Sequence, residues 1–146
     1  MTNSAAKLPL DAYPATTMQT LRYNDMDPAG HVNNAVYSTL FEAGRVPILY
    51  DPSRQMPPAG SHFSIVKLTI DFRSELTWPG EVTIGTGVTR IGGSSVGLLQ
   101  AIFNDGHCCA TAENIVVLTD STTRKSTALP DHARAWFETL LISGQA

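Results

Sequence analysis

Residues 24–37 read NDMDPAGHVNNAVY, and they decide the fold because a polar loop turns into a helix within a few positions. Asn33 or Asn34 is expected to be the N-cap, since a short side-chain oxygen can accept a hydrogen bond from a first-turn N–H. Apolar residues then recur at helical spacing to about residue 49. The stretch predicts a long, mostly apolar helix, which Pro47 should kink or end early because proline lacks an N–H.

The segments on either side of this helix predict strands. Residues 1–15 are polar or contain proline and are expected to form a loose lead-in, and residues 16–23 (TTMQTLRY) are interpreted as a strand. After a loop rich in turn-forming residues, the hydrophobic period changes to two from Phe63 onward. The apolar face of this second strand is predicted to hold Val66, Leu68, Ile70 and Phe72.

Three short connections follow, and they predict a four-strand antiparallel meander. They read TWPGE, IGGSS and NDGH. Asp105-Gly106 is the clearest hairpin signal, because a primed two-residue turn needs positive φ. Residues 130–143 predict a short closing helix with a stripe of Ala133, Trp136, Phe137, Leu140 and Leu141. The order of elements predicts an α+β fold in one domain spanning residues 1–146.

Composition excludes several classes of function. A formal net charge of -3 gives no basic footprint for nucleic acid. The sequence has neither an apolar run long enough for a membrane helix nor the apolar centre of a signal peptide, so a cytoplasmic protein without a membrane partner is expected. Cys108 and Cys109 are adjacent in a predicted strand and cannot pair without distortion. No spaced Cys/His set predicts a metal site.

The opening loop combines groups that suit acyl transfer. The free N–H groups at a helix start can hold an oxygen that bears partial negative charge. Asp27 lies just upstream, and the bend at Pro28–Gly30 could aim its carboxylate back at the helix tip. A carboxylate beside an electrophile holder can attack a carbonyl or activate water.

Residues 22–37, RYNDMDPAGHVNNAVY, resemble the first-strand and helix-entry motif of hotdog-fold thioesterases of the 4-hydroxybenzoyl-CoA thioesterase type. The similarity continues through the Pro-Gly and Gly-Ser turns and covers roughly residues 17–120. It implies a hotdog fold, an antiparallel sheet wrapped around one long central helix. It also implies an acyl-CoA thioesterase that hydrolyses a thioester to free acid and coenzyme A.

The resemblance assigns roles to individual residues. It makes Asp27 the catalytic base or nucleophile and places the N–H that polarises the carbonyl at Asn34. His31 completes the catalytic set, either by contacting the substrate or by orienting the loop. Substrate contacts are implied at Asn33, Tyr37, Ser64, Val66, Arg90, Gly92, Ser94 and Ser95. Asn33 also has a capping role, and Tyr37 could equally be a core residue.

Several alternatives remain open on the sequence. Glu42 occupies the position of the catalytic carboxylate in a related hotdog clade, although an ion pair with Arg45 at i+3 explains it equally well. A non-catalytic acyl-CoA-binding protein would keep the pocket without turnover. A hotdog enoyl-CoA hydratase or dehydratase would need a suitably placed histidine, and His62 resembles that residue only weakly. The resemblance further implies a homodimer or homotetramer, with coenzyme A entering as part of the substrate and no separate cofactor.

Overall fold

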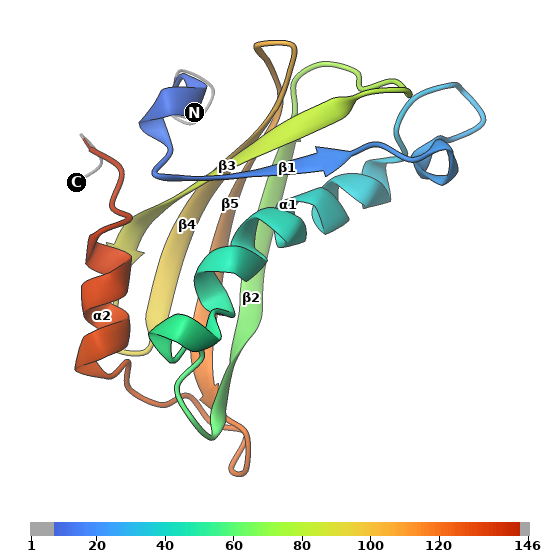
Figure 1. Ribbon diagram of the computed structural model, residues 1–146. Helices are drawn as coiled ribbons and strands as arrows, with labels where there is room; N and C mark the ends of the chain where they lie inside the picture. The colour runs from blue at the N-terminus through green and yellow to red at the C-terminus, as the bar shows by residue number, and fades with distance from the viewer. Residues whose placement is uncertain (1–7, 144–146) are drawn as a thin grey trace.

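The computed structural model describes residues 8–143, which form a five-stranded antiparallel sheet with a long helix on one face (Figure 1). The strands are β1 (Ala15–Thr20), β2 (Ser61–Phe72), β3 (Glu81–Ile91), β4 (Ser95–Asn104) and β5 (His107–Asp120). The helices are α1 (Asn34–Leu49) and the shorter α2 (Asp131–Glu138), with 3₁₀ turns at Leu10–Ala12, Tyr23–Asp25 and Pro52–Arg54. This is the α+β hotdog architecture that the resemblance predicted.

The sheet has the strand order β1-β3-β4-β5-β2, which corrects the predicted four-strand meander. Only β3, β4 and β5 form consecutive hairpins, and β2 pairs with β5 at the far edge. The connection over residues 73–80 crosses the end of the sheet instead of making a hairpin. It is held there because the N–H groups of Val32 and Leu21 each donate to it at 2.8 Å.

A bulge changes the phase of β2 relative to the predicted alternation. Ile65 pairs with Val116 and Lys67 with Ile115, so Val66 is the extra residue. The simple period of two had predicted that Val66 shares a face with Leu68, and the bulge makes this prediction wrong. Val66 is 60% exposed.

Helix α1 begins where its cap predicts. The side chain of Asn33 accepts a hydrogen bond from the Ala35 N–H at 2.9 Å, which makes Asn33 the N-cap. The helix passes through Pro47 and ends at Leu49, so the predicted early end at the proline is wrong. Its buried face packs against β1, β3 and β4.

The middle of α1 lies unusually close to the sheet at Gly44. A Cβ atom added there would lie 2.5 Å from the Ile84 side chain and 2.9 Å from Gln100 Nε2. Next to it, Arg45 donates to Gln100 Oε1 at 3.5 Å and belongs to none of the ion pairs of the described residues. The predicted ion pair with Glu42 is therefore wrong.

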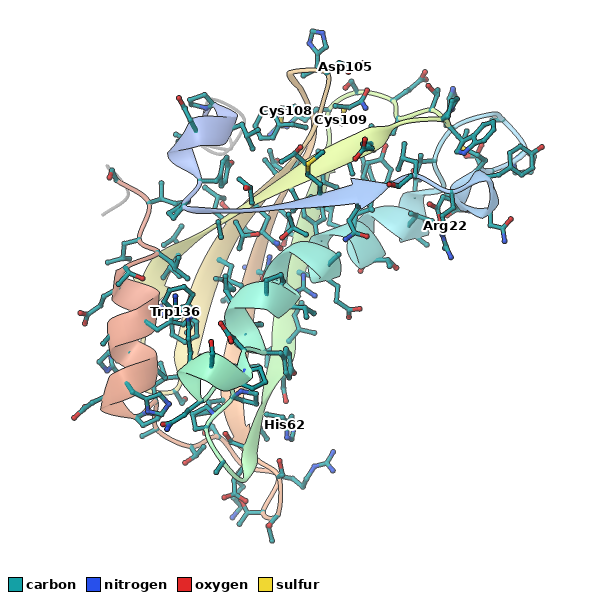
Figure 2. The ribbon with its side chains drawn as sticks, in the orientation of Figure 1. Arg22, His62, Asp105, Cys108, Cys109 and Trp136 are labelled. Atoms are coloured by element: carbon teal, nitrogen blue, oxygen red, sulfur yellow. The ribbon has the colours of Figure 1, made fainter. Side chains whose placement is uncertain are left out.

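The C-terminal segment closes the opposite end of the sheet. Phe137 is fully buried, and Trp136 Nε1 donates to the Ile48 carbonyl at 3.0 Å, which joins α2 to the end of α1 (Figure 2). Leu141 lies beyond the helix and is exposed, which corrects its place in the predicted buried stripe.

Three smaller expectations can be compared with the structure. Strand β1 ends at Thr20, before the predicted boundary at residue 23, because Tyr23–Asp25 forms a 3₁₀ turn. Asp105 and Gly106 both have positive φ, as the predicted hairpin requires. The adjacent Cys108 and Cys109 are free thiols, also as predicted. Within residues 8–143, no helix is both long enough and apolar enough to cross a membrane.

Candidate functional site

A tight loop between β1 and α1 fixes the carboxylate of Asp27. Its Oδ1 accepts hydrogen bonds from the N–H groups of Ala29, at 2.9 Å, and His31, at 3.1 Å. The Asp27 N–H in turn donates to the His31 carbonyl at 2.7 Å. Gly30 closes the bend with a φ of +86°, a conformation that glycine adopts without steric cost. Oδ2 has no hydrogen-bond partner among the described residues and is left for a ligand or water.

The first turn of α1 offers one unused donor next to this loop. The Ala35 N–H is taken by the Asn33 side chain, and the Val36 N–H donates to the Asn33 carbonyl at 2.9 Å. The Asn34 N–H has no partner within the described part of the chain. Since Asn34 is the first helical residue, this N–H lies at the positive end of the helix dipole.

Asp27 and Asn34 line the same cavity, which we name the Asp27 pocket. Its volume is about 340 Å³. The residues lining it are Asp27, His31, Val32, Asn34, Tyr37, Phe72, Arg73, Ser74 and Glu75. The loop and the helix start supply the first five, and the end of β2 with the segment after it supplies the others. The pocket thus brings together a carboxylate, an unused helix-tip N–H and a partly apolar wall.

Two charged residues of this pocket were missed by the sequence interpretation. Glu75 Oε2 lies 3.1 Å from His31 Nε2, so the imidazole is held between its own loop and the segment after β2. Arg73 also lines the pocket, with its guanidinium 3.4 Å from Thr111 Oγ1. Neither residue belongs to a local motif, and only the placement of β2 at the sheet edge brings them to the helix tip.

Tyr37 forms part of the pocket wall and of the core together, so both of its expected roles are compatible with the structure. It is buried, and its ring packs edge-on against Phe72 with the centroids 4.9 Å apart. Burial raises the pKa of the Tyr37 hydroxyl, which keeps it protonated at neutral pH.

Asp25, the first acid of the motif, supports the loop and lines no wall of the Asp27 pocket. Its carboxylate accepts from the Arg22 backbone N–H at 2.8 Å and from the Arg22 guanidinium at 2.9 Å. The Asp25 carbonyl accepts from the Asn33 N–H at 2.8 Å, which ties the loop to the helix cap. Burial alone would raise the pKa of Asp25, but the hydrogen bonds and charge of Arg22 hold it below its usual value.

The other residues implied as substrate contacts do not line the Asp27 pocket. Asn33 is exposed and uses its side chain as the cap. Ser64 Oγ is 3.0 Å from Thr119 Oγ1, and Val66 is the bulged residue of β2. Arg90 and Ser95 line a separate hollow of about 290 Å³ with residues of β2 and β5. Gly92 and Ser94 lie in the turn between β3 and β4 and line neither cavity.

His62 lies at the other end of β2 from the Asp27 loop. Figure 2 shows it near the bottom of the sheet, whereas Arg22, next to the loop, lies at the top right. Its Nδ1 is 2.9 Å from Ser121 Oγ. In one chain, therefore, His62 and Asp27 do not share a pocket. Residues 8–143 contain no group of three or more His, Cys, Asp or Glu side chains arranged to hold a metal ion.

The fold is shared with solved thioesterase structures. A predicted thioesterase from Bacillus stearothermophilus is 28% identical, covering 87% of this chain and 96% of that one, with a TM-score of 0.79. The YbaW probable thioesterase from Escherichia coli is 27% identical, with coverage of 87% and 98% and a TM-score of 0.75. A thioesterase from Thermus thermophilus, solved with coenzyme A and Zn, is 25% identical, with coverage of 89% and 96% and a TM-score of 0.78.

The family comparison covers the Asp27 loop, α1, strands β2 to β5 and most of α2, and it begins just after β1. A search of curated proteins finds no match to the chain. A comparison with protein families matches residues 21–137 to one family. With its hotdog fold and with the Asp27 pocket at the start of α1, the chain belongs to the thioesterase-like superfamily.

Proposed function

We propose that the protein is an acyl-CoA thioesterase that uses Asp27 and the N-terminus of α1 to hydrolyse its substrate. The observation that carries the proposal is the shared pocket lined by Asp27 and Asn34, because Asp27 Oδ2 and the Asn34 N–H both lack a hydrogen-bond partner within residues 8–143. The membership of the thioesterase-like superfamily supports the same activity.

The proposed reaction begins with the thioester oxygen at the Asn34 N–H. This donor stabilises the negative charge that develops on the oxygen as the carbonyl carbon becomes tetrahedral. Asp27 either removes a proton from water, whose oxygen then bonds to the acyl carbon, or attacks that carbon itself and is released by water. The carbon–sulfur bond breaks and the coenzyme A thiolate takes up a proton, so that free acid and thiol leave. No separate cofactor is part of this proposal.

The hydrogen bonds at Oδ1 explain how the loop would serve this role. Two backbone N–H groups fix the orientation of the carboxylate, and Oδ2 stays available to the substrate or to water. The contact between His31 Nε2 and Glu75 Oε2 lies on the same pocket wall and would restrict the approach to it. The Asp27 carboxylate would then be positioned before the substrate arrives, which lowers the reorganisation needed in the transition state.

We infer a homodimer or homotetramer whose subunits meet along β2. This strand is an edge of the sheet, and an unpaired edge is a surface on which another strand can pair. Ile65, Val66 and Phe72 are exposed along β2, as are Val46 on α1 and Tyr50 directly after it. Analytical ultracentrifugation tests the inference, and a monomer at micromolar concentration would contradict it.

Release of free thiol tests the proposed activity. The wild type is incubated with short, medium, long and aromatic acyl-CoAs, beside Asp27→Asn and the control Asp105→Asn. Asp105 is an exposed aspartate in the turn between β4 and β5, away from the pocket. Because a positioned base or nucleophile contributes about 10²–10⁴-fold, Asp27→Asn should lose that much in kcat while the control keeps its activity.

The same assay distinguishes the alternatives. Tight binding of acyl-CoA without thiol release by the wild type would support a non-catalytic binding protein. Conversion of an enoyl-CoA to its hydroxyacyl form, followed by ultraviolet absorbance, would support a hydratase. Equal activity of Asp27→Asn and the wild type would exclude the proposed role of Asp27.

A further inference from the structure

A row of apolar side chains lies along the inner face of β2 beside α1, and we name this row the α1–β2 furrow. Because α1 packs mainly against β1, β3 and β4, it covers the inner face of β2 only in part. Five apolar residues share this face, since each pairs with a buried residue of β5: Phe63, Ile65, Leu68, Ile70 and Phe72. The Asp27 pocket lies at one end of this α1–β2 furrow, against Phe72.

A second cavity, which we name the Arg45 pocket, lies at the other end of the furrow. Its volume is about 130 Å³. It is lined by Glu42, Arg45, Val46, Leu49, Tyr50, Phe63, Ile65 and Val116. This volume corresponds to roughly four water molecules, which is room for a carboxylate and a few methylene groups.

Arg45 is a buried cation with few partners. Only 7% of the residue is exposed, and the one side-chain hydrogen bond that it makes within residues 8–143, to Gln100 Oε1, is 3.5 Å long. A guanidinium carries five N–H donors, and leaving them unpaired away from water costs free energy. Burial lowers the pKa of Arg45, although the charge of the exposed Glu42 opposes this. Arg45 therefore lines its pocket as a charge that forms no ion pair with any of the described residues.

The neighbouring polar side chains have little left to offer Arg45. Gln100 Oε1 already accepts from Asn114 Nδ2 at 2.9 Å. Gln100 Nε2 donates to the Phe41 carbonyl at 3.0 Å and to Thr86 Oγ1 at 2.9 Å. Among the described residues this network leaves one buried acceptor, Asn114 Oδ1, without a hydrogen-bond partner. A guanidinium has five N–H donors, so a ligand in the pocket would supply acceptors beyond those of the network.

The positions of the two pockets along α1 suit one extended ligand. Arg45 lies about three turns after Asn34, so the two residues are on the same side of the helix. At a rise of 1.5 Å per residue, they are about 16 Å apart along the helix axis. The apolar residues of β2 line the path between them. A thioester at Asn34 with a medium-length acyl chain along the furrow would therefore place the end of that chain near Arg45.

We propose that the Arg45 pocket binds a terminal carboxylate, so that acyl chains carrying a second acid group at their far end are preferred substrates. This inference rests on the proposed thioesterase function. A carboxylate would give the guanidinium the paired, charge-assisted hydrogen bonds that it lacks. Its oxygens would lie across the pocket from Glu42, and the repulsion from that side chain would weaken the binding.

The test compares sebacyl-CoA with decanoyl-CoA, which match in chain length and differ only in the terminal group. The ratio of their kcat/KM values should favour sebacyl-CoA in the wild type and fall at least about tenfold in Arg45→Met, because hydrogen bonds to a charged group are lost. Arg45→Lys should keep part of the preference, and Glu42→Gln should increase it. The control Arg124→Met changes an arginine that lines neither pocket and should keep the wild-type ratio.

Binding without turnover separates this proposal from the proposed function. Calorimetry on Asp27→Asn with sebacic and decanoic acid should show tighter binding of the diacid, and Asp27→Asn/Arg45→Met should lose that difference. If no acyl-CoA is hydrolysed but this difference is seen, the thioesterase proposal alone fails. If decanoyl-CoA is hydrolysed and neither assay favours the diacid, the carboxylate proposal alone fails.

A role in subunit contact would give a different result. Arg45→Met would then change the sedimentation coefficient while the ratio of kcat/KM values stayed that of the wild type, which would overturn the carboxylate proposal. Far-ultraviolet circular dichroism establishes that each variant is folded. If Arg45→Met does not fold, Arg45→Lys and Glu42→Gln provide the test. The proposal predicts a lower preference for sebacyl-CoA in Arg45→Lys and a higher one in Glu42→Gln, and a ratio of kcat/KM values unchanged in both would contradict it.

Discussion

Within residues 8–143, the start of α1 has an unpaired backbone N–H, whereas the middle of α1 is packed closely against the sheet. At its start, the Asn34 N–H has no protein partner in the described structure, and Asn34 lines a pocket together with Asp27. Further along, Gly44 lies so close to β3 and β4 that an added Cβ would collide with Ile84 and Gln100. The same helix thus leaves a donor free at one end, and its middle is packed too closely to admit a methyl group. The difference indicates that the close packing holds the helix in place and its open end carries the proposed chemistry.

Asn34→Pro should produce the largest effect, because it removes the N–H at the helix start. Proline suits the first helical position, and Asn33 already has the extended conformation (φ -59°, ψ 138°) that a residue before proline adopts. We expect kcat to fall by about 10²-fold or more, with the melting temperature almost unchanged. Asn34→Ala keeps the N–H and serves as the control. Similar kcat values for Asn34→Pro and Asn34→Ala would show that the Asn34 N–H has no role in the reaction.

Gly44→Ala tests the packed half of the helix. Alanine favours a helix by about 1 kcal/mol over glycine, but the collision with Ile84 should outweigh this gain and leave the protein destabilised by about 1–3 kcal/mol. Urea unfolding measures the change as a lower midpoint at constant m-value. Gly93→Ala is the matched control, because a Cβ there meets no atom within 4 Å. Equal stability of the two variants would show that α1 does not need this close approach.

The fold was largely accessible from the sequence wherever the determinants are local. The cap at Asn33 and the turn at Asp105-Gly106 depend on neighbouring residues, so both were predicted. The partner of β2 depends on where the chain crosses the sheet, and nothing within the strand specifies that. The bulge at Val66 also depends on the pairing with β5, which explains why the predicted alternation has the wrong phase there.

The same distinction applies to the candidate site. Asp27 and Asn34 lie in one continuous motif, whereas Arg73 and Glu75 reach the pocket only because β2 ends beside the helix start. Their charges follow a strand and look like ordinary surface residues in the sequence. Arg45 was interpreted as half of an ordinary helical ion pair with Glu42, since sequence spacing does not reveal that Arg45 is buried.

Glu75→Gln should have a smaller effect than either helix variant. It removes the carboxylate that contacts His31 Nε2, and both side chains are partly exposed. Even when such an exposed pair is charged on both sides, it contributes only about 0–1 kcal/mol. We expect kcat/KM of the best substrate to fall by about fivefold or less. Glu138→Gln, at the end of α2, is the control. A loss as large as that of Asp27→Asn would mean that Glu75 takes part in the chemistry directly.

Asp25 should contribute a small, pH-dependent term to stability. Its pKa is lower in the folded chain than in the unfolded chain, so its contribution is present above the unfolded value of about 3.9 and is lost as the pH falls through the folded value. Asp25→Asn should therefore be less stable than the wild type at neutral pH, and the gap should close in acid. Urea unfolding at a series of pH values measures this, and a constant gap would contradict the assigned role.

Infrared difference spectroscopy of a bound thioester addresses the role of the helix start most directly. An acyl-CoA with an isotope-labelled carbonyl would be bound to Asp27→Asn, which is expected to hydrolyse it slowly. If the Asn34 N–H polarises the carbonyl, its stretching frequency should fall relative to the free thioester and return toward the free value in Asp27→Asn/Asn34→Pro. A bound frequency equal to that in solution would contradict the account.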